Sequence, residues 1–396
     1  MIARSLAPAA LALLGPLVAG CYGSFGRPAD LDAGEPPRGD ARPAAPDLGA
    51  PDLGAPDGGP LDHGAVDLGA PDLGPPDLGA DSGPLLSGCE LAGLRGPIGG
   101  NSRCLSPVAL HDGVAYRWRC TQREVIAIPD VGDLPLVSTA TEEGATDAVV
   151  HGERLLVTTS VAPPFVASFA LDDPEVPSDP RGYSDDGPVR VLAARGDLAA
   201  VGAQRGDEPG ILRLLRLGAD GVLDPLGRLD LSPWQVADLS FADEDTVAVL
   251  LARPTVRRST EEALVVVDVS DPSAPLEAGR RVFGATILDQ RIATVGATGL
   301  TVGPDLQVLD LDDRQHLPTL AQEVFDEVAV TIAADAFVAY LGTTGVLAYD
   351  LSNPRAPRRL AASPPTPDVI DLAVDDGLVA LSTDRGLYVL DFFCDR

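Results

Sequence analysis

Short apolar strands that recur along the chain predict an all-β fold, a seven-bladed β-propeller of four-stranded blades preceded by a disordered tether. The repeated unit is clearest at residues 262–279 (EALVVVDVSDPSAPLEAG), where an apolar strand runs into a polar turn and a return strand follows. Related strand ends fall near residues 128, 170, 218, 268, 310, 350 and 391, with spacings of 42, 48, 50, 42, 40 and 41. A period of about 40–50 residues with several short strands per unit is typical of a β-propeller.

Residues 1–20 have the features of a signal peptide. A short basic start is followed by an apolar run from Leu6 to Val18, which is shorter than the roughly 20 residues that a membrane-spanning helix needs. The run ends in residues 17–21 (LVAGC), which resemble the bacterial lipobox. This resemblance implies lipidation of Cys21 and anchoring to a membrane. By resemblance to Gram-negative lipoproteins, Tyr22 in place of Asp implies the outer membrane of a bacterial cell envelope, with the protein periplasmic or surface-exposed.

Residues 21–84 read as a tether built on a five-residue unit. PDLGA occurs at 46–50 and 51–55, and variants continue to residue 80. Pro blocks helices, the Asp in each unit repels its neighbours, and one Leu per unit is too little to form a core. We therefore expect a disordered, partly extended linker that leads into the propeller domain, residues 85–396.

Each unit of the propeller domain also carries an apolar hairpin ahead of its polar turn. These hairpins are expected at residues 147–160, 191–203, 236–252, 285–297, 330–342 and 369–382. The hairpin supplies two inner strands, the segment that ends at the turn supplies a third, and the segment after the turn supplies a fourth. In the turns, the side chains of Asp and Ser are expected to hydrogen-bond to nearby backbone N–H groups.

Two of the turns resemble a known repeat. Residues 265–272 (VVVDVSDP) with Pro275, and residues 346–354 (VLAYDLSNP) with Pro357, look like the LVIVD repeat. The resemblance extends over roughly residues 105–396 and is weakest at 211–225. It implies a β-propeller in an exported or surface protein, and it carries over no catalytic residues.

Ring closure and the cysteines are expected to go together. The last unit ends at residues 386–393 without a fourth strand, and residues 88–96 are the available partner for its exposed edge. An exported chain favours disulfides. Cys104 and Cys120 lie symmetrically about the turn at Asp112, so they face each other across a hairpin. That pairing leaves Cys89 to join Cys394 and connect the first strand to the last.

The sequence offers few groups for chemistry. Its four His residues lie in different units, no metal-ligand spacing occurs, and we expect no cofactor, metal or catalytic residue. Trp234, Phe283 and Phe325 occupy matching places in successive units, and exposed aromatic residues on one face would suit a binding site. The alternative is that they pack between blades.

Charge and channel lining bear on function. The net charge of −30 disfavours nucleic acid as a partner. The inner strands are largely Val, Ala and Leu with scattered Asp238, Glu327 and Asp371, which favours a non-enzymatic binding or scaffolding module for envelope proteins or glycans. We expect a monomer. The alternatives are a lactonase-like hydrolase with a metal in the central channel and a purely structural envelope protein.

Overall fold

The computed structural model describes residues 86–98, 106–129, 132–141, 144–159, 163, 165–184, 187–203, 210–254, 260–286 and 291–395. The chain divides into two units, Met1–Ala80 and Asp81–Arg396, and everything described here belongs to the second. The predicted signal peptide, Cys21 and the predicted tether lie outside the described residues. Within the described residues, no helix is long and apolar enough to cross a membrane.

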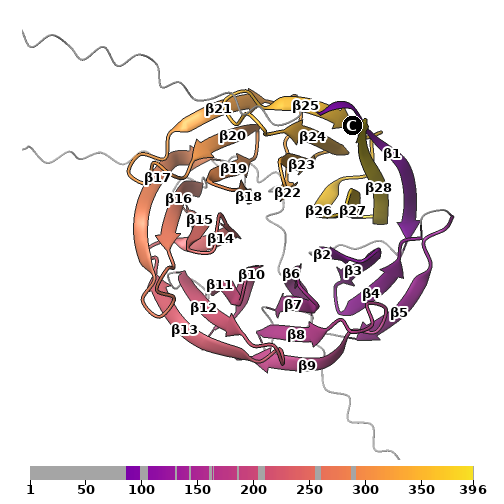
Figure 1. Ribbon diagram of the computed structural model, residues 1–396, viewed down its shortest axis with the longest axis horizontal. Helices are drawn as coiled ribbons and strands as arrows, with labels where there is room; N and C mark the ends of the chain where they lie inside the picture. The colour runs from indigo at the N-terminus through magenta and orange to yellow at the C-terminus, as the bar shows by residue number, and fades with distance from the viewer. Residues whose placement is uncertain are drawn as a thin grey trace, which may run out of the picture. The chain divides into compact units, whose positions relative to one another are not determined.

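Seven antiparallel four-stranded sheets form a ring around a central channel (Figure 1). The innermost strands are β2 (Val108–His111), β6 (Ala145–His151), β10 (Val189–Arg195), β14 (Gln235–Phe241), β18 (Arg291–Val295), β22 (Thr331–Asp335) and β26 (Val369–Asp375). The second strands are β3 (Val114–Arg119), β7 (Arg154–Thr159), β11 (Leu198–Ala203), β15 (Thr246–Pro254), β19 (Thr298–Val302), β23 (Val338–Gly342) and β27 (Leu378–Thr383).

The third strands are β4 (Gln122–Ala127), β8 (Val166–Ala170), β12 (Ile211–Leu217), β16 (Thr260–Asp268), β20 (Asp305–Asp310), β24 (Val346–Asp350) and β28 (Gly386–Asp395). The outer strands are β5 (Leu136–Thr141), β9 (Ser178–Tyr183), β13 (Leu223–Asp230), β17 (Leu276–Thr286), β21 (Thr319–Val324), β25 (Arg358–Ala362) and β1 (Ser87–Ile98). The predicted seven-bladed propeller is thus confirmed, and blades are numbered here from the one that begins with β2.

Burial follows the position of a strand within its blade. All residues of β11 and β23 are buried, whereas β5 and β9 are almost entirely exposed. A second strand packs against neighbouring blades on both faces, so its sequence is a continuous apolar run instead of an alternating one. The apolar clusters accordingly extend across blade boundaries. One joins β10–β12 to β14–β16, and another joins β15 and β16 to β18 and β20.

The polar turns have the structural role that the sequence predicts. Asp268 accepts hydrogen bonds from the backbone N–H and the hydroxyl of Ser270, at 3.0 and 2.6 Å. Asp310 and Asp350 accept the N–H two residues ahead in the same way. These side-chain contacts fix the tight reversal between the third and fourth strands.

The ring closes through its two ends. β1 pairs antiparallel with β28 and serves as the outer strand of blade 7 (Figure 1), which confirms the predicted pairing. A disulfide joins Cys89 to Cys394, 305 residues apart. Cys120 is also disulfide-bonded. Its predicted partner, Cys104, lies outside the described residues.

One predicted hairpin is wrong. The sequence indicates a hairpin over residues 285–297, but the inner hairpin of blade 5 pairs β18 with β19 around Gly296 and Ala297. Asp289 and Gln290 have the composition of a turn and lie between the outer strand β17 and β18. Gly296 has φ +53°, a conformation that glycine adopts at little cost, and it provides the true reversal.

Candidate functional site

The central channel contains a cavity of about 320 Å³ with a ring of matching positions around it. Each blade contributes one ring residue from the start of its innermost strand or from just before it. This residue lies four positions ahead of the residue at which the first hairpin of the blade begins to turn. In blade order, the ring is Pro107, Asp147, Val191, Asp238, Arg291, Thr331 and Asp371, and all seven residues line the cavity. The ring therefore gathers three carboxylates and one guanidinium from four different blades.

A local irregularity in the inner strand precedes each ring aspartate. The pairing register shifts between Ala145 and Asp147, between Val236 and Asp238, and between Val369 and Asp371. A β-bulge redirects the side chains that follow it, and bulges are common next to functional positions. The same shift also precedes Val191, the ring residue of blade 3.

Each ring aspartate bonds to a neighbouring blade. Asp147 accepts the backbone N–H of Ala148 at 2.8 Å and, from blade 3, that of Leu192 at 2.7 Å. Asp238 accepts the N–H of the residue after it at 3.0 Å and that of Ile292, in blade 5, at 2.9 Å.

Asp371 completes the pattern across the closure of the ring. It accepts the backbone N–H of Val108, in blade 1, at 2.9 Å and the hydroxyl of Thr331, in blade 6, at 3.3 Å. An innermost strand has no neighbour on its channel side, and carboxylates are acceptors that can satisfy the N–H groups left over there. The ring aspartates therefore join blade 2 to 3, blade 4 to 5, and blade 7 to both 1 and 6.

The ring carboxyls are held in a poorly solvated place. Burial raises the pKa of Asp147 well above its usual range, and the charges of Asp238 and Asp371 raise it further. Burial also raises the pKa of Asp238, and it brings the pKa of Asp371 to about 6. The Arg291 guanidinium opposes the rise at all three carboxyls. As whole residues, the three are only partly buried.

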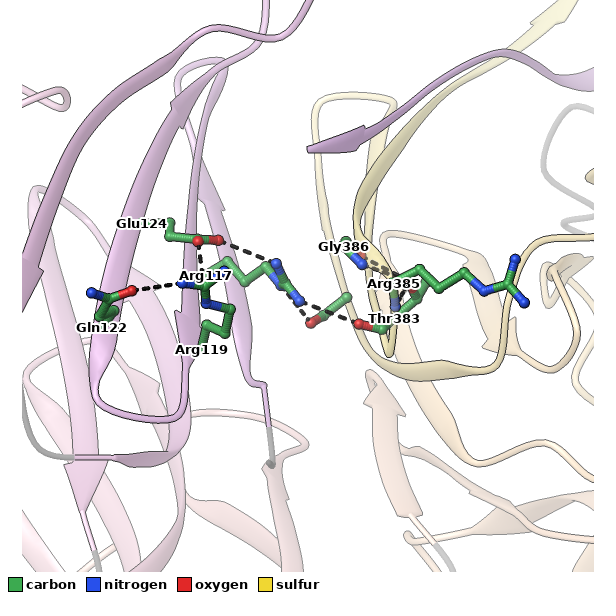
Figure 2. A network of polar contacts seen from close by, with 8 residues as sticks. Arg117, Arg119, Gln122, Glu124, Thr383, Arg385 and Gly386 are labelled. Carbon is green, nitrogen blue, oxygen red and sulfur yellow. Dashed lines mark hydrogen bonds and ion pairs between the residues drawn. The ribbon is translucent and has the colours of Figure 1, made fainter. Parts of the chain in front are cut away.

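A second polar network lies at the seam between blades 1 and 7. Figure 2 shows the Arg117 side chain between Glu124, on β4, and the residues around Thr383 in blade 7. Arg117 is fully buried and forms a 3.1 Å ion pair with Glu124, itself buried. Its other nitrogens donate to the hydroxyl of Ser382 and the carbonyl of Thr383, both at 3.2 Å. All these contacts lie inside the protein, so the network is a structural link across the closure of the ring.

The three aromatic residues predicted for binding lie at three separate blade boundaries. Trp234 is only 6% exposed, and the guanidinium groups of Arg253 and Arg280 lie 4.8 and 5.9 Å from its ring centroid. Phe283 is partly buried against the cluster shared by blades 4 and 5. Phe325 packs on Tyr349, with 6.1 Å between the ring centroids. Their role in binding remains a prediction.

Sequence reasoning located part of the ring. It named Asp238 and Asp371, which the structure brings to one cavity, and it missed Asp147, Arg291 and Thr331. Glu327, grouped with the inner strands from sequence, is instead exposed on the link into blade 6, where it accepts hydrogen bonds from Thr344. The sequence does carry a signal for the ring. When the inner hairpins are aligned on their turns, Asp147, Asp238 and Asp371 fall at the same position.

The described part of the chain contains no preformed metal-binding site. No three His, Cys, Asp or Glu side chains there are close enough together to hold a metal ion. The ring carboxylates stand on blades 2, 4 and 7.

The comparisons with known proteins support the fold. No protein-family model matches this chain, and no curated protein matches it. A crystal structure of the computationally designed protein Ika8 is similar at 12% identity and a TM-score of 0.50, over 74% of this chain and 98% of that one. A chain of a mitotic checkpoint complex is similar at 10% identity and a TM-score of 0.56, over 77% of this chain and 94% of that one. Similarities at this level of identity show the fold alone.

Proposed function

We propose that this protein is a lipid-anchored, extracytoplasmic β-propeller that acts as a non-enzymatic binding or scaffolding module for protein or glycan partners of a bacterial cell envelope. The resemblance of residues 17–21 to a lipobox supports the anchor at Cys21, and the resemblance to the LVIVD repeat supports an exported propeller. The propeller fold suits such a module because its loops and channel present a wide, rigid surface.

The hydrogen bonds of the channel aspartates favour a binding module over an enzyme. The three channel aspartates, which would be the acid–base or metal-binding groups of an enzyme, each hydrogen-bond to an adjacent blade. Carboxylates that hold the ring together are poorly placed to change partners during a reaction. The alternative, a metal-dependent hydrolase of the lactonase type, draws on the same three carboxylates and therefore needs a direct test.

That test is hydrolysis by the full chain, with Ca²⁺, Zn²⁺, Mg²⁺ or Mn²⁺ added, of a panel of lactones, carboxylic esters and phosphoesters. The triple variant Asp147→Asn/Asp238→Asn/Asp371→Asn is the control, after its melting curve shows that it folds. We expect no metal-dependent turnover above that control. Metal-dependent turnover that is absent in the triple variant would mean that the protein is a hydrolase and not a binding module.

The anchor is tested separately. The wild-type chain, expressed in a Gram-negative host, is expected to enter the detergent phase in Triton X-114 partitioning and to carry acyl chains on Cys21 by mass spectrometry. The Cys21→Ser variant should stay in the aqueous phase, because a stable anchor needs the methylenes of more than one acyl chain. Equal partitioning of the two proteins would refute lipidation at this position.

A further inference from the structure

We propose that the channel binds an organic cation with an aliphatic stem, that is, an alkylguanidinium or alkylammonium group of the kind found in arginine and lysine side chains. This inference rests on the proposed binding function and names the chemistry of its ligand. It follows from the charged groups of the cavity, the acceptor capacity of its carboxyls and the aliphatic residues among its lining.

The charges of the cavity do not balance. Among the described residues that line it, the acidic ones are Asp147, Asp238 and Asp371, and the basic one is Arg291. Three carboxyls and one guanidinium carry a net charge of −2 only when all are ionised, and burial raises the pKa of each carboxyl. A cation that enters the cavity favours the ionised form of these carboxyls, because charges there are screened less than in water.

The carboxylates keep acceptor capacity toward the channel. An ionised carboxylate offers about four acceptor positions. Asp147 uses one on each oxygen, for the N–H groups of Ala148 and Leu192. The three residues are only partly buried and line the cavity. Because the three carboxylates stand on different blades, they suit a ligand with several N–H donors that point in different directions, such as a guanidinium.

Aliphatic residues line the cavity together with the polar ring. Its lining also includes aliphatic residues of the inner strands, among them Leu110, Val150, Ile332 and Val374, which belong to or pack against the apolar clusters of the blades. Lysine and arginine combine such an apolar stem with a charged head. The volume of about 320 Å³ lies at the low end of the roughly 300–1,000 Å³ of small-ligand cavities, so one stem and its head suit the space.

Arg291 shows that the ring accepts a guanidinium. Its positive charge acts on Asp147, Asp238 and Asp371 at once, and it opposes in each the rise in pKa that burial causes. A second guanidinium or ammonium group would stabilise the ionised carboxylates in the same sense. The protein thus carries one such group of its own and retains negative charge for another.

The test is isothermal titration calorimetry of the full-length Cys21→Ser chain with n-butylguanidinium at pH 7.5 in 150 mM NaCl, which screens the acidic outer surface. The neutral isostere n-butylurea is the control ligand. We expect saturable one-to-one binding of the cation and at least tenfold weaker binding of the urea. N-acetyl-arginine amide, run alongside, distinguishes a free small cation from a side chain of a partner protein, because it binds only if the cavity admits an arginine attached to a backbone.

Three variants test whether the cation binds at the ring. Asp238→Asn should weaken binding of the cation at least tenfold, whereas Asp243→Asn, the same charge change in the exposed turn of the same blade, should alter it less than twofold. Arg291→Gln should tighten binding of the cation at least threefold, because it removes the competing guanidinium. A folding defect would weaken binding, so tighter binding cannot come from misfolding.

Equal effects of the two aspartate variants would mean surface attraction only, and they would overturn the proposal. Binding of the urea as strong as that of the cation, or no saturable binding of either, would also overturn it. If hydrolysis is absent as well, such a result leaves the proposed binding module intact with another ligand.

Discussion

Asp371 joins its own blade to two others through a carboxyl group that the protein solvates poorly. Burial raises its pKa from 3.8 to about 6, so the folded state takes up a proton at a higher pH than the unfolded chain does. By linkage, this group adds stability as the pH falls from about 7 toward 5, and that stability is lost as the pH rises through 6. The size is roughly 1–3 kcal/mol, at about 1.4 kcal/mol per pKa unit.

The corresponding measurement is urea unfolding of the full-length Cys21→Ser chain between pH 7.5 and 5.5. We expect its free energy of unfolding to rise over this range, and the Asp371→Asn variant to lose that part of the slope. Asp376→Asn, a neighbour exposed in the hairpin turn, is the matched control and should keep the slope. Parallel pH profiles for the unsubstituted chain and Asp371→Asn would contradict the assigned role.

Glu124 compensates a charge that has no access to water. Replacing it with Gln leaves the Arg117 guanidinium fully buried without its ion-pair partner. Breaking one side of a buried pair costs roughly 3–5 kcal/mol, whereas replacing both sides with apolar residues of similar size is often neutral. We expect Glu124→Gln to lower the free energy of unfolding by that amount and Arg117→Met/Glu124→Met to recover most of it. Equal losses in the two proteins, measured by denaturant unfolding, would argue against a buried pair.

At the residue scale, the sequence indicated some site groups and hid others. Asp238 and Asp371 stand out because an acid in an apolar strand is unusual. Arg291 was assigned to the middle of a hairpin that does not form, so its position in the channel was not foreseen. Arg117 and Glu124 have the pattern of ordinary surface charges on a strand, and only the closure of the ring buries them together.

Among the elements, β17 depends on a glycine at a close approach between blades. A Cβ at Gly279 would collide with the backbone carbonyl of Arg314, in the polar turn of blade 5. Ala321 takes the corresponding place on β21, after an equivalent shift of register. The outer strand and the turn of the next blade are therefore in tight contact between blades 4 and 5.

Gly279→Ala tests this contact. We expect it to lower the free energy of unfolding by about 1–3 kcal/mol, the usual cost of overpacking. Ala321→Gly, at the corresponding place on β21, should cost at most about 1 kcal/mol, the difference that backbone entropy makes. A Gly279→Ala protein as stable as its parent would mean that the two blades separate easily at this contact.

The elements were predictable because their pattern is local. Apolar runs of five to seven residues and turns of Asp, Ser, Gly and Pro give the strands, and the recurrence of the third strand gives the number of blades. The error in blade 5 arose because Asp289 and Gln290 have the composition of a turn, and pattern alone does not tell a link between blades from a turn within one.

For the molecule as a whole, closure depends on the pairing of β1 with β28 and on the disulfide between Cys89 and Cys394. A cross-link over 305 residues stabilises mainly by restricting the unfolded chain, and loop entropy gives an upper value of about 6 kcal/mol. We expect Cys89→Ser/Cys394→Ser to lower the melting temperature and to speed hydrogen exchange in β1 and β28 more than in β11. Unchanged exchange in β1 would show that strand pairing alone closes the ring.

The central claim is that the channel carboxylates hold the blades together and bind without catalysis. Its most direct test is the metal content of the purified full-length Cys21→Ser chain, measured by mass spectrometry after dialysis against buffer without chelator. We predict far less than one equivalent of any metal, with no difference from the Asp147→Asn/Asp238→Asn/Asp371→Asn variant. One equivalent of calcium or zinc that the variant lacks would contradict the claim and direct attention to hydrolase substrates.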